Sequence, residues 1–338
     1  MQEGIAVASN QLRGSVAIPI CSLPPGYHYS PMRKPQALKP GDEVRIVTPA
    51  SPLKPEQTKT GIELLESWGL KVTLAPHVYE RDGYLAGPDE VRAKDLMDAF
   101  ADPKVKAVFC SRGGYGCARL MPLLDLDAIM ASGKLFCGFS DVTTLHLALN
   151  QAGFPTFHCP MLITLSAPRV DWVYDSLRKG LFGEDPFDVP HPTGETLNPG
   201  TAEGVLVGGC TILISDSLAT PYALETEGRI LVLEGVDEDP HRVDARLTQL
   251  RNSGLLKRAA GIVIGEMSGA DERRDENIGA WPWRRIVEDR VKGLGVPAIV
   301  NFPFGHMKTM LSMPLGIRAR LDADKGTLTL LESLCDAG

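Results

Sequence analysis

The sequence predicts an α/β fold with two domains. Three observations support this prediction: the chain has 338 residues, short apolar runs alternate with segments of helical periodicity, and a Pro- and Gly-rich stretch at 185–203 interrupts that alternation. A chain of this length is typical of two domains. Strand-helix alternation with nearly continuous apolar strands is typical of a parallel sheet covered by helices. We therefore expect an N-terminal parallel-sheet domain of Rossmann-like (flavodoxin-like) type and a smaller, mixed α/β C-terminal domain.

Composition sets the expected domain boundaries. Residues 1–37 are rich in Pro and Gly and predict an irregular N-terminal extension. The first α/β domain is expected over 38–184, a linker over 185–203, and the second domain over 204–338. The linker is predicted because its sequence, EDPFDVPHPTGETLNPGTAE from Glu184 on, shows no period.

The elements of each domain follow from their periodicity. In the first domain we expect strands at EVRIVTPAS, KVTLAPHV, VKAVFCS, KLFCGFS and TFHCPM, with helices at PEQTKTGIELLESWGL, DEVRAKDLMDAFAD and the segment after Ser140. In the second domain we expect strands at GVLVGG, RILVLEG, AAGIVIGEM and PAIVNFPFGH, and an antiparallel hairpin formed by IRARLDA and GTLTLLE. Ligands of such folds bind beyond the carboxyl ends of the parallel strands.

Charge and cysteine content exclude several functions. The net charge is −7 and the pI is near 5.6, which argues against a nucleic-acid partner. The seven cysteines are scattered through apolar runs, as expected for reduced thiols in the cytoplasm, and they have no zinc-ligand spacing. No apolar run is long enough to span a membrane, and the first residues do not resemble a signal peptide. We therefore expect a cytoplasmic protein with no membrane partner, metal or cofactor.

Ser140 lies between an apolar strand and a helix, in GFSDVTTLHLAL. A serine at this position is most often an N-cap that accepts a hydrogen bond from the helix backbone. The alternative is a nucleophile elbow, in which a tight turn exposes the hydroxyl beside backbone N–H groups. The local sequence leaves both interpretations open.

A glycine cluster ends the preceding strand, in VFCSRGGYGCARLM. It is neither a Walker sequence nor a dinucleotide-binding sequence, because Gly113-Gly114-Tyr115-Gly116 is too compact and no Gly-Lys-Ser/Thr follows. Glycines do allow backbone amides to approach a neighbouring group, such as an oxyanion forming at Ser140.

Glu234 and His306 lie at two later strand ends. A carboxylate at the end of a buried strand needs a partner, although Glu234 could also be an ordinary loop acid like Glu238 and Asp239, which we expect to be solvated. Most isolated histidines are structural, but a serine nucleophile requires a base with a pKa near neutrality. His158 is the rival candidate for the base, and we interpret it as packing near the sheet edge.

The order Ser140, Glu234, His306, each at a predicted strand end, is typical of a catalytic triad on an α/β scaffold. The blocks SRGGYGCARLMPLLDLDAI, GFSDVTTLHLAL, LVLEGVDEDPHRVDARLTQL and GHMKTMLSMPLG resemble those of the LD-carboxypeptidase family of serine peptidases, which includes the microcin C self-immunity proteins. The resemblance covers roughly residues 38–333.

The resemblance implies that Ser140 is the nucleophile, Glu234 the acid that orients the histidine and His306 the general base. It also implies an oxyanion hole formed by the backbone N–H groups of Gly114 and Asp141, and a homodimer.

The resemblance suggests a murein tetrapeptide as substrate, cleaved between the L-centre of a diamino acid and a terminal D-alanine. Arg112 and Gly113 are the candidate substrate-binding residues; Arg112 would hold the terminal carboxylate, or it is simply a charge beside a helix. The chain departs from the family pattern at Phe139, Cys210 and His241. Of these departures, Cys210 puts the lining of the substrate cleft in question.

Two alternative functions use the same fold. An immunity-type hydrolase would cleave a peptidyl-nucleotide or acyl-adenylate and would need an aromatic residue to stack on the base. Trp172 is the only tryptophan in the segment 166–203, where relatives of that type carry a longer loop. A non-catalytic binding protein of periplasmic-receptor type would also have two lobes, but it would need a signal peptide and no serine at the elbow.

Overall fold

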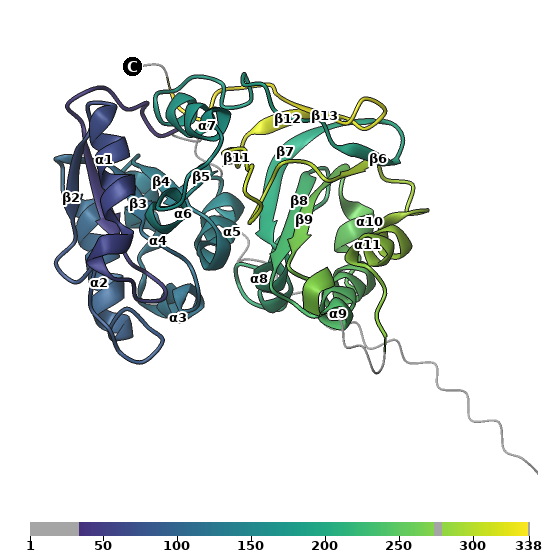
Figure 1. Cartoon of the computed structure of the whole chain (residues 1–338), viewed down its shortest axis with the longest axis horizontal. Coiled ribbons are helices and arrows are strands. Elements are labelled where there is room, and N and C mark those ends of the chain that lie inside the picture. The colour runs from purple at the N-terminus through teal and green to yellow at the C-terminus, as the bar shows by residue number, and fades with distance from the viewer. Residues whose placement is uncertain (1–33, 274–278, 337–338) are drawn as a thin grey trace, which may run out of the picture.

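The computed structural model describes residues 34–273 and 279–336, which form two β-sheets beside each other (Figure 1). Residues 1–33 of the expected extension lie outside the described residues. The N-terminal half, purple to teal in Figure 1, contains the first sheet, and the green to yellow half contains the second. Helix α5 (Thr143–Gln151) lies between them and contacts both β5 of the first sheet and β7 of the second.

The first sheet has the strand order β11-β5-β4-β3-β1-β2. Its strands are β1 (Glu43–Val47), β2 (Lys71–Leu74), β3 (Val105–Cys110), β4 (Leu135–Gly138), β5 (Thr156–His158) and β11 (Met313–Leu315). The pairs among β1 to β5 are parallel, and β11 is antiparallel to β5. The order of β1 to β5 is that of flavodoxin-like sheets, which confirms the expected fold class.

The helical segments of this half follow the strands in alternation. They are η1 (Pro55–Gln57), α1 (Lys59–Ser67), α2 (Asp89–Ala101), α3 (Cys117–Leu120), η2 (Met121–Leu123), α4 (Leu126–Ala131), η3 (Ser140–Val142), α5, α6 (Leu162–Leu165) and α7 (Asp171–Leu181).

The second sheet has the strand order β13-β12-β7-β8-β9-β10-β6. Its strands are β6 (Glu195–Asn198), β7 (Thr201–Cys210), β8 (Ile230–Val236), β9 (Gly261–Ser268), β10 (Ala298–Val300), β12 (Arg318–Asp322) and β13 (Thr327–Leu330). Strands β7 to β10 are parallel, and β12 and β13 form the expected antiparallel hairpin. The helical segments are α8 (Thr211–Asp216), α9 (Pro240–Asn252), α10 (Leu255–Arg258), η4 (Asp271–Arg273) and α11 (Trp283–Val291).

Two short strands depart from the expected domain division. Strand β6 lies inside the segment 185–203, where we expected a linker, and pairs with β10 at the edge of the second sheet. Strand β11 comes from the C-terminal part of the chain but adds to the first sheet. It contains Pro314, which lacks a backbone N–H and is therefore tolerated at a sheet edge. Both strands are short, and neither sequence alternates between apolar and polar residues. The sequence alone therefore does not predict them, and they are recognised by the strands they pair with.

Alternation along β8 directs side chains to two different cores. Leu231 and Leu233 belong to one buried cluster together with residues of α9 and α11. Ile230 and Val232 belong to another, together with Phe302 and Phe304 of the segment after β10. Successive side chains of a strand point to opposite faces, so Glu234, in phase with Ile230 and Val232, is directed toward that segment. His306 lies on the same segment, and the strand period therefore brings the two residues together.

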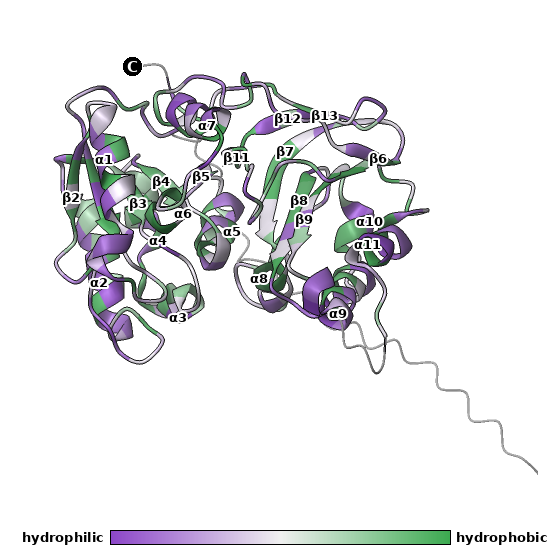
Figure 2. Cartoon of the chain, in the orientation of Figure 1, coloured by the Kyte–Doolittle hydropathy of each residue, from purple (hydrophilic) through white to green (hydrophobic). Residues whose placement is uncertain are grey.

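Hydropathy agrees with this arrangement. Figure 2 shows hydrophobic strands within each half and hydrophilic residues on α9 and α11.

The cysteines of the described part, six in number, are all free and buried. None of the helices in the described ranges combines the length and apolar character needed to cross a bilayer.

Candidate active site

Ser140 lies on a tight turn between β4 and α5. Its φ is 66°, a left-handed conformation that non-glycine residues rarely adopt, and Phe139 before it is extended. The helical segment that starts at Ser140 has no side-chain cap hydrogen bond, so the N-cap interpretation of Ser140 is wrong. Gly138 permits the tight turn, because a Cβ there would lie 3.0 Å from the side chains of Cys110 and Val142.

The structure brings Ser140, His306 and Glu234 together from three separate segments. The Ser140 Oγ lies 3.0 Å from His306 Nε2, and His306 Nδ1 lies 2.6 Å from Glu234 Oε2. Because an ionised carboxylate can only accept, Nδ1–H donates to Glu234 and Nε2 is free to accept the hydroxyl proton. This is the geometry of a nucleophile, a base and an orienting acid.

Glu234 is fully buried, whereas His306 retains 16% of its side-chain exposure. Gly305 makes the close approach possible: its φ is +98°, and a Cβ there would lie 2.5 Å from the Cβ of Glu234. A larger residue at position 305 would separate the histidine segment from the acid.

The pKa of His306 lies above its usual value of 6.5. Burial lowers this pKa, but the charge of Glu234 and the hydrogen bond to it raise the pKa by more. The imidazolium that forms when His306 takes a proton is therefore stabilised at this position.

The glycine turn packs directly on the nucleophile. A Cβ at Gly113 would lie 2.8 Å from the Cβ of Ser140 and 3.2 Å from the backbone nitrogen of Asp141. The Asp141 side chain turns away from this point and accepts a hydrogen bond of 2.8 Å from the backbone N–H of Cys117, and its burial raises its pKa. Gly113 therefore packs against Ser140 and beside the backbone nitrogen of Asp141.

Arg112 is half-buried and its guanidinium donates to backbone carbonyls. Its Nε donates to Gly113 O at 3.2 Å and its Nη1 to Pro52 O at 2.9 Å. Burial lowers its pKa from the usual value of 12.5. To bind a substrate carboxylate, as predicted, the guanidinium of Arg112 would have to use donors other than these two or give up these hydrogen bonds.

His158 does not contact Ser140 in the network of described hydrogen bonds. Both of its ring nitrogens are buried without a partner among the described residues, and burial holds its pKa well below 6.5. Its ring packs 4.4 Å from the ring of Phe304 and 5.4 Å from that of Phe139, measured between centroids. A buried, neutral histidine of this kind is a packing residue, as we expected from its sequence.

The three departures from the family pattern lie in different environments. Phe139 is buried, and its ring packs against the imidazole of His306, with 4.8 Å between the two ring centroids. Cys210 is also buried, its backbone N–H donates to Thr143 Oγ1 at 3.1 Å, and burial holds its thiol pKa well above 9.0. His241 is exposed at the start of α9.

Our expectation for Glu238 is wrong. Its side chain is only 13% exposed and lies 3.7 Å from Arg246 Nε, and burial raises its pKa. It is not the solvated loop acid that its neighbours in sequence suggested, because α9 folds back over it. Asp239, with 42% of its side chain exposed, fits the expectation.

Sequence reasoning missed two residues that shape the site, Ser51 and Thr143. The Ser51 N–H donates to Gly113 O at 3.3 Å, and its Oγ accepts from the Tyr115 N–H at 3.1 Å. Thr143 connects the nucleophile helix to β7 through Cys210. Neither is signalled by a motif, since each acts through a backbone group of a distant segment.

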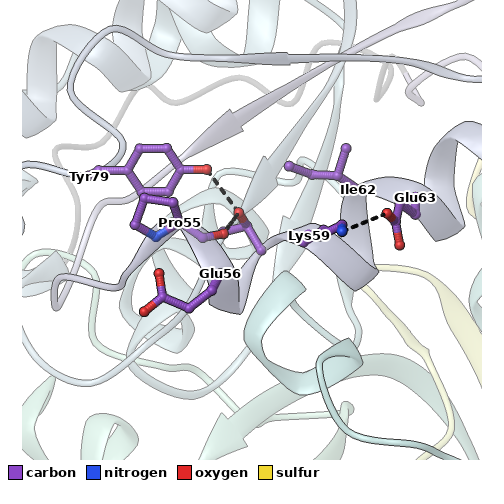
Figure 3. A pocket seen from close by; sticks show the side chains of 7 residues that line it. Pro55, Glu56, Lys59, Ile62, Glu63 and Tyr79 are labelled. Carbon is purple, nitrogen blue, oxygen red and sulfur yellow. Dashed lines mark hydrogen bonds and ion pairs between the residues drawn. The ribbon is translucent and has the colours of Figure 1, made fainter.

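A separate hollow of about 470 Å³ lies beside η1 and α1 (Figure 3). It is lined by Pro55, Glu56, Thr58, Lys59, Ile62, Glu63 and Tyr79. In this hollow the Tyr79 hydroxyl is hydrogen-bonded to the Thr58 hydroxyl at 2.8 Å, and Lys59 forms an ion pair with Glu63 at 3.8 Å (Figure 3). This hollow contains no nucleophile paired with a base, in contrast to the surroundings of Ser140. In the described ranges, no His, Cys, Asp and Glu side chains cluster as metal ligands.

Comparison with known proteins gives matches in both halves of the chain. Residues 44–159 match the LD-carboxypeptidase N-terminal domain, and residues 203–321 match the LD-carboxypeptidase C-terminal domain. A putative carboxypeptidase of Streptomyces coelicolor is 40% identical over 315 residues, which cover 90% of this chain and 98% of that protein. The murein tetrapeptide carboxypeptidase of Pseudomonas aeruginosa is 32% identical over 294 residues, covering 83% of this chain and 94% of the relative.

Solved structures agree with these matches. The muramoyltetrapeptide carboxypeptidase of Oxalobacter formigenes has a TM-score of 0.75 and 28% identity, and covers 87% of this chain and 99% of its own. The microcin C7 self-immunity protein in complex with aspartyl sulfamoyl adenosine has a TM-score of 0.79 at 22% identity, covering 90% of this chain and 99% of its own. At that identity the second similarity concerns the fold.

Proposed function

Because the chain belongs to the LD-carboxypeptidase family, we propose that it is a serine carboxypeptidase that releases the terminal D-alanine from murein tetrapeptide. The observation that carries this proposal is the continuous contact from Ser140 Oγ through His306 to Glu234, at 3.0 and 2.6 Å. Relatives named for murein peptides, at 32% and 37% identity, support the substrate class.

In the proposed mechanism, Ser140 attacks the carbonyl carbon at the L-centre of the diamino acid while His306 Nε2 takes the hydroxyl proton. The C–N bond to D-alanine then breaks, and the protonated His306 gives its proton to the departing amine. Water, deprotonated by His306, then attacks the carbonyl carbon of the acyl-serine ester. The ester C–O bond breaks, His306 returns the proton to Ser140 Oγ, and the shortened peptide is released. Glu234 stabilises the imidazolium in each half of the reaction.

The tetrahedral oxyanion needs hydrogen-bond donors that are already in place. We assign this role to the backbone N–H groups of Gly114 and Asp141. Support comes from the close packing of Gly113 on Ser140 and on the Asp141 nitrogen. No metal or cofactor is required in this scheme, since every proton and electron pair has a protein or substrate partner.

The runner-up function is an immunity-type hydrolase that acts on a peptidyl-nucleotide. Such a substrate calls for an exposed aromatic side chain that stacks on the base. Trp172 instead packs, partly buried, against the apolar cores. The carboxypeptidase function is therefore preferred.

One assay distinguishes the two functions. The purified protein is incubated with murein tetrapeptide and, separately, with an aspartyl-adenylate peptide, and products are quantified by mass spectrometry. Release of D-alanine from the tetrapeptide alone supports the proposal. Cleavage of the nucleotide conjugate alone would replace it with the immunity function, and cleavage of neither would leave a binding protein.

We also propose a homodimer in the cytoplasm. The buried, free thiols of the described cysteines are compatible with a reducing compartment. Light scattering coupled to gel filtration would test the assembly.

A further inference from the structure

The peptide group between Gly113 and Gly114 is held on its carbonyl side by two donors. The Ser51 N–H donates to Gly113 O at 3.3 Å, and Arg112 Nε donates to the same oxygen at 3.2 Å. The carbonyl oxygen of Gly113 and the N–H of Gly114 belong to one planar peptide unit. Whatever fixes one of these groups therefore fixes the other.

The two ends of this peptide unit point in opposite directions. No peptide bond in the described chain is cis, so the N–H of Gly114 points away from the Gly113 oxygen, and hence away from Ser51 and Arg112. Gly113 itself lies against Ser140. At Gly114, a Cβ would lie 2.4 Å from Ser51 Oγ, so the turn is enclosed between the two serines.

Arg112 and Ser51 are themselves fixed. Arg112 Nη1 donates to Pro52 O at 2.9 Å, and Ser51 Oγ accepts from the Tyr115 N–H at 3.1 Å. The loop after β1 and the loop after β3 are thus joined by hydrogen bonds on both sides of the peptide. Neither loop has a regular structure of its own that would hold Gly114 in place.

We propose that Arg112 is a positioning residue that orients and polarises the oxyanion-binding peptide. Its positive charge and hydrogen bond at Gly113 O increase the donor strength of the N–H at the other end of the same amide, because hydrogen bonds in a chain reinforce one another. This role rests on the proposed function, in which the Gly114 N–H binds the oxyanion. It replaces the interpretation that Arg112 binds the carboxylate of the substrate.

The first test measures the oxyanion hole without the peptide substrate. A fluorophosphonate phosphonylates an active serine: the serine oxygen bonds to phosphorus through a pentacoordinate species, fluoride leaves, and the phosphoryl oxygen is held by the same donors as the oxyanion. We expect Arg112→Met to lower the rate of Ser140 labelling by about 10- to 100-fold, less than the loss of a complete oxyanion donor. Arg112→Lys, which keeps the charge, should recover part of that rate. Ser51→Ala keeps the backbone N–H that donates to Gly113 O and loses only the bond from the Tyr115 N–H, so it should slow labelling less than Arg112→Met does. Arg119→Met is the matched control, because Arg119 is an exposed arginine of the following helix, paired with Asp89, and should label like the wild type.

The second test separates positioning from carboxylate binding. Murein tetrapeptide and its C-terminal amide are compared as substrates of the wild type and Arg112→Met. We expect the variant to lose kcat by a similar factor on both, with little change in KM. If Arg112→Met labels as fast as the wild type, or if it loses only the preference for the carboxylate over the amide, the positioning role is refuted.

The two tests also separate this inference from the proposed function. If the wild type labels rapidly but releases no D-alanine, the substrate assignment fails while the role of Arg112 is still measured. Thermal melting of each variant checks folding. Should Arg112→Met not fold, Arg112→Gln, which removes the charge but keeps a polar side chain, takes its place, and labelling of that variant at the wild-type rate would overturn the proposal.

Discussion

His306 Nδ1 lies 2.6 Å from Oε2 of Glu234, whose side chain has no exposed surface. A buried carboxylate is costly unless a donor compensates it, and its other oxygen, Oε1, has no hydrogen-bond partner among the described residues. His306 is therefore the main compensating group for Glu234. The pair is arranged to become more favourable when the imidazole gains a proton, which is what serine attack requires.

Replacing Glu234 by Gln should lower kcat by about 10²- to 10⁴-fold, because an amide favours the wrong tautomer of His306 and offers no charge to the imidazolium. KM should change little, since the interaction strengthens only as charge develops on the ring. Steady-state kinetics of D-alanine release measure both constants.

The control for Glu234→Gln is Asp239→Asn, because Asp239 is exposed and near in sequence. Glu238 is unsuitable, since it is buried beside Arg246. If Asp239→Asn is the impaired enzyme and Glu234→Gln is normal, the assignment of the acid is wrong.

The pH dependence of kcat/KM should show a limb controlled by His306. Only the neutral imidazole accepts the serine proton, so the rate should fall as the pH drops through the His306 pKa, which lies above 6.5. In Glu234→Gln the charge that raises this pKa is gone while burial still lowers it, so the limb should move to lower pH. A rate that stays flat between about pH 5 and 8 would contradict a histidine base, whose unperturbed pKa is about 6.5.

Replacing Ser140 by Ala should abolish D-alanine release, by a factor of about 10⁴ or more, as found when a triad nucleophile is removed. The fold should persist, because the hydroxyl makes no cap bond and its described partner is His306. Ser166→Ala, at an exposed serine in the same half, is the matched control. Activity retained in Ser140→Ala would mean that another group is the nucleophile.

The sequence predicts much of the site because its three residues lie near or after the carboxyl ends of parallel strands, one strand in the first sheet and two in the second. Ser140 follows β4, Glu234 ends a run of four buried apolar residues in β8, and His306 follows β10. The apolar runs therefore predict which strands lead to the three residues, although β8 continues past Glu234 to Val236 and β10 already ends at Val300, well before His306. The left-handed φ of Ser140 was also foreseeable as an elbow, but the sequence could not exclude the cap.

The rest depends on contacts between distant segments, which no local pattern encodes. The bonds from Ser51 to the glycine turn join residues more than 60 positions apart, at Gly113 and Tyr115. The burial of Glu238 requires Arg246 to lie over it, and β11 is a strand only because β5 offers an edge. These features follow from the folded chain and not from the composition of their own segments.

Replacing Gly113 by Ala tests the oxyanion site by filling it. Gly113 does not have a positive φ, so alanine should fit the backbone without strain. Its Cβ, however, would lie 2.9 Å from Ser140 Oγ and 3.2 Å from the Asp141 nitrogen, where the oxyanion must be bound. We expect kcat to fall by about 10²-fold or more, the order of magnitude for losing an oxyanion donor, and the melting temperature to fall as well, because a Cβ 2.8 Å from the Ser140 Cβ forces the turn to shift. Gly133→Ala provides the control, since its φ is +63° and a Cβ there would meet nothing within 4 Å. That variant should lose stability by about 1 kcal/mol through backbone strain and keep its kcat. If Gly113→Ala melts early but turns over normally, the glycine is required for folding alone, and the oxyanion must be bound elsewhere.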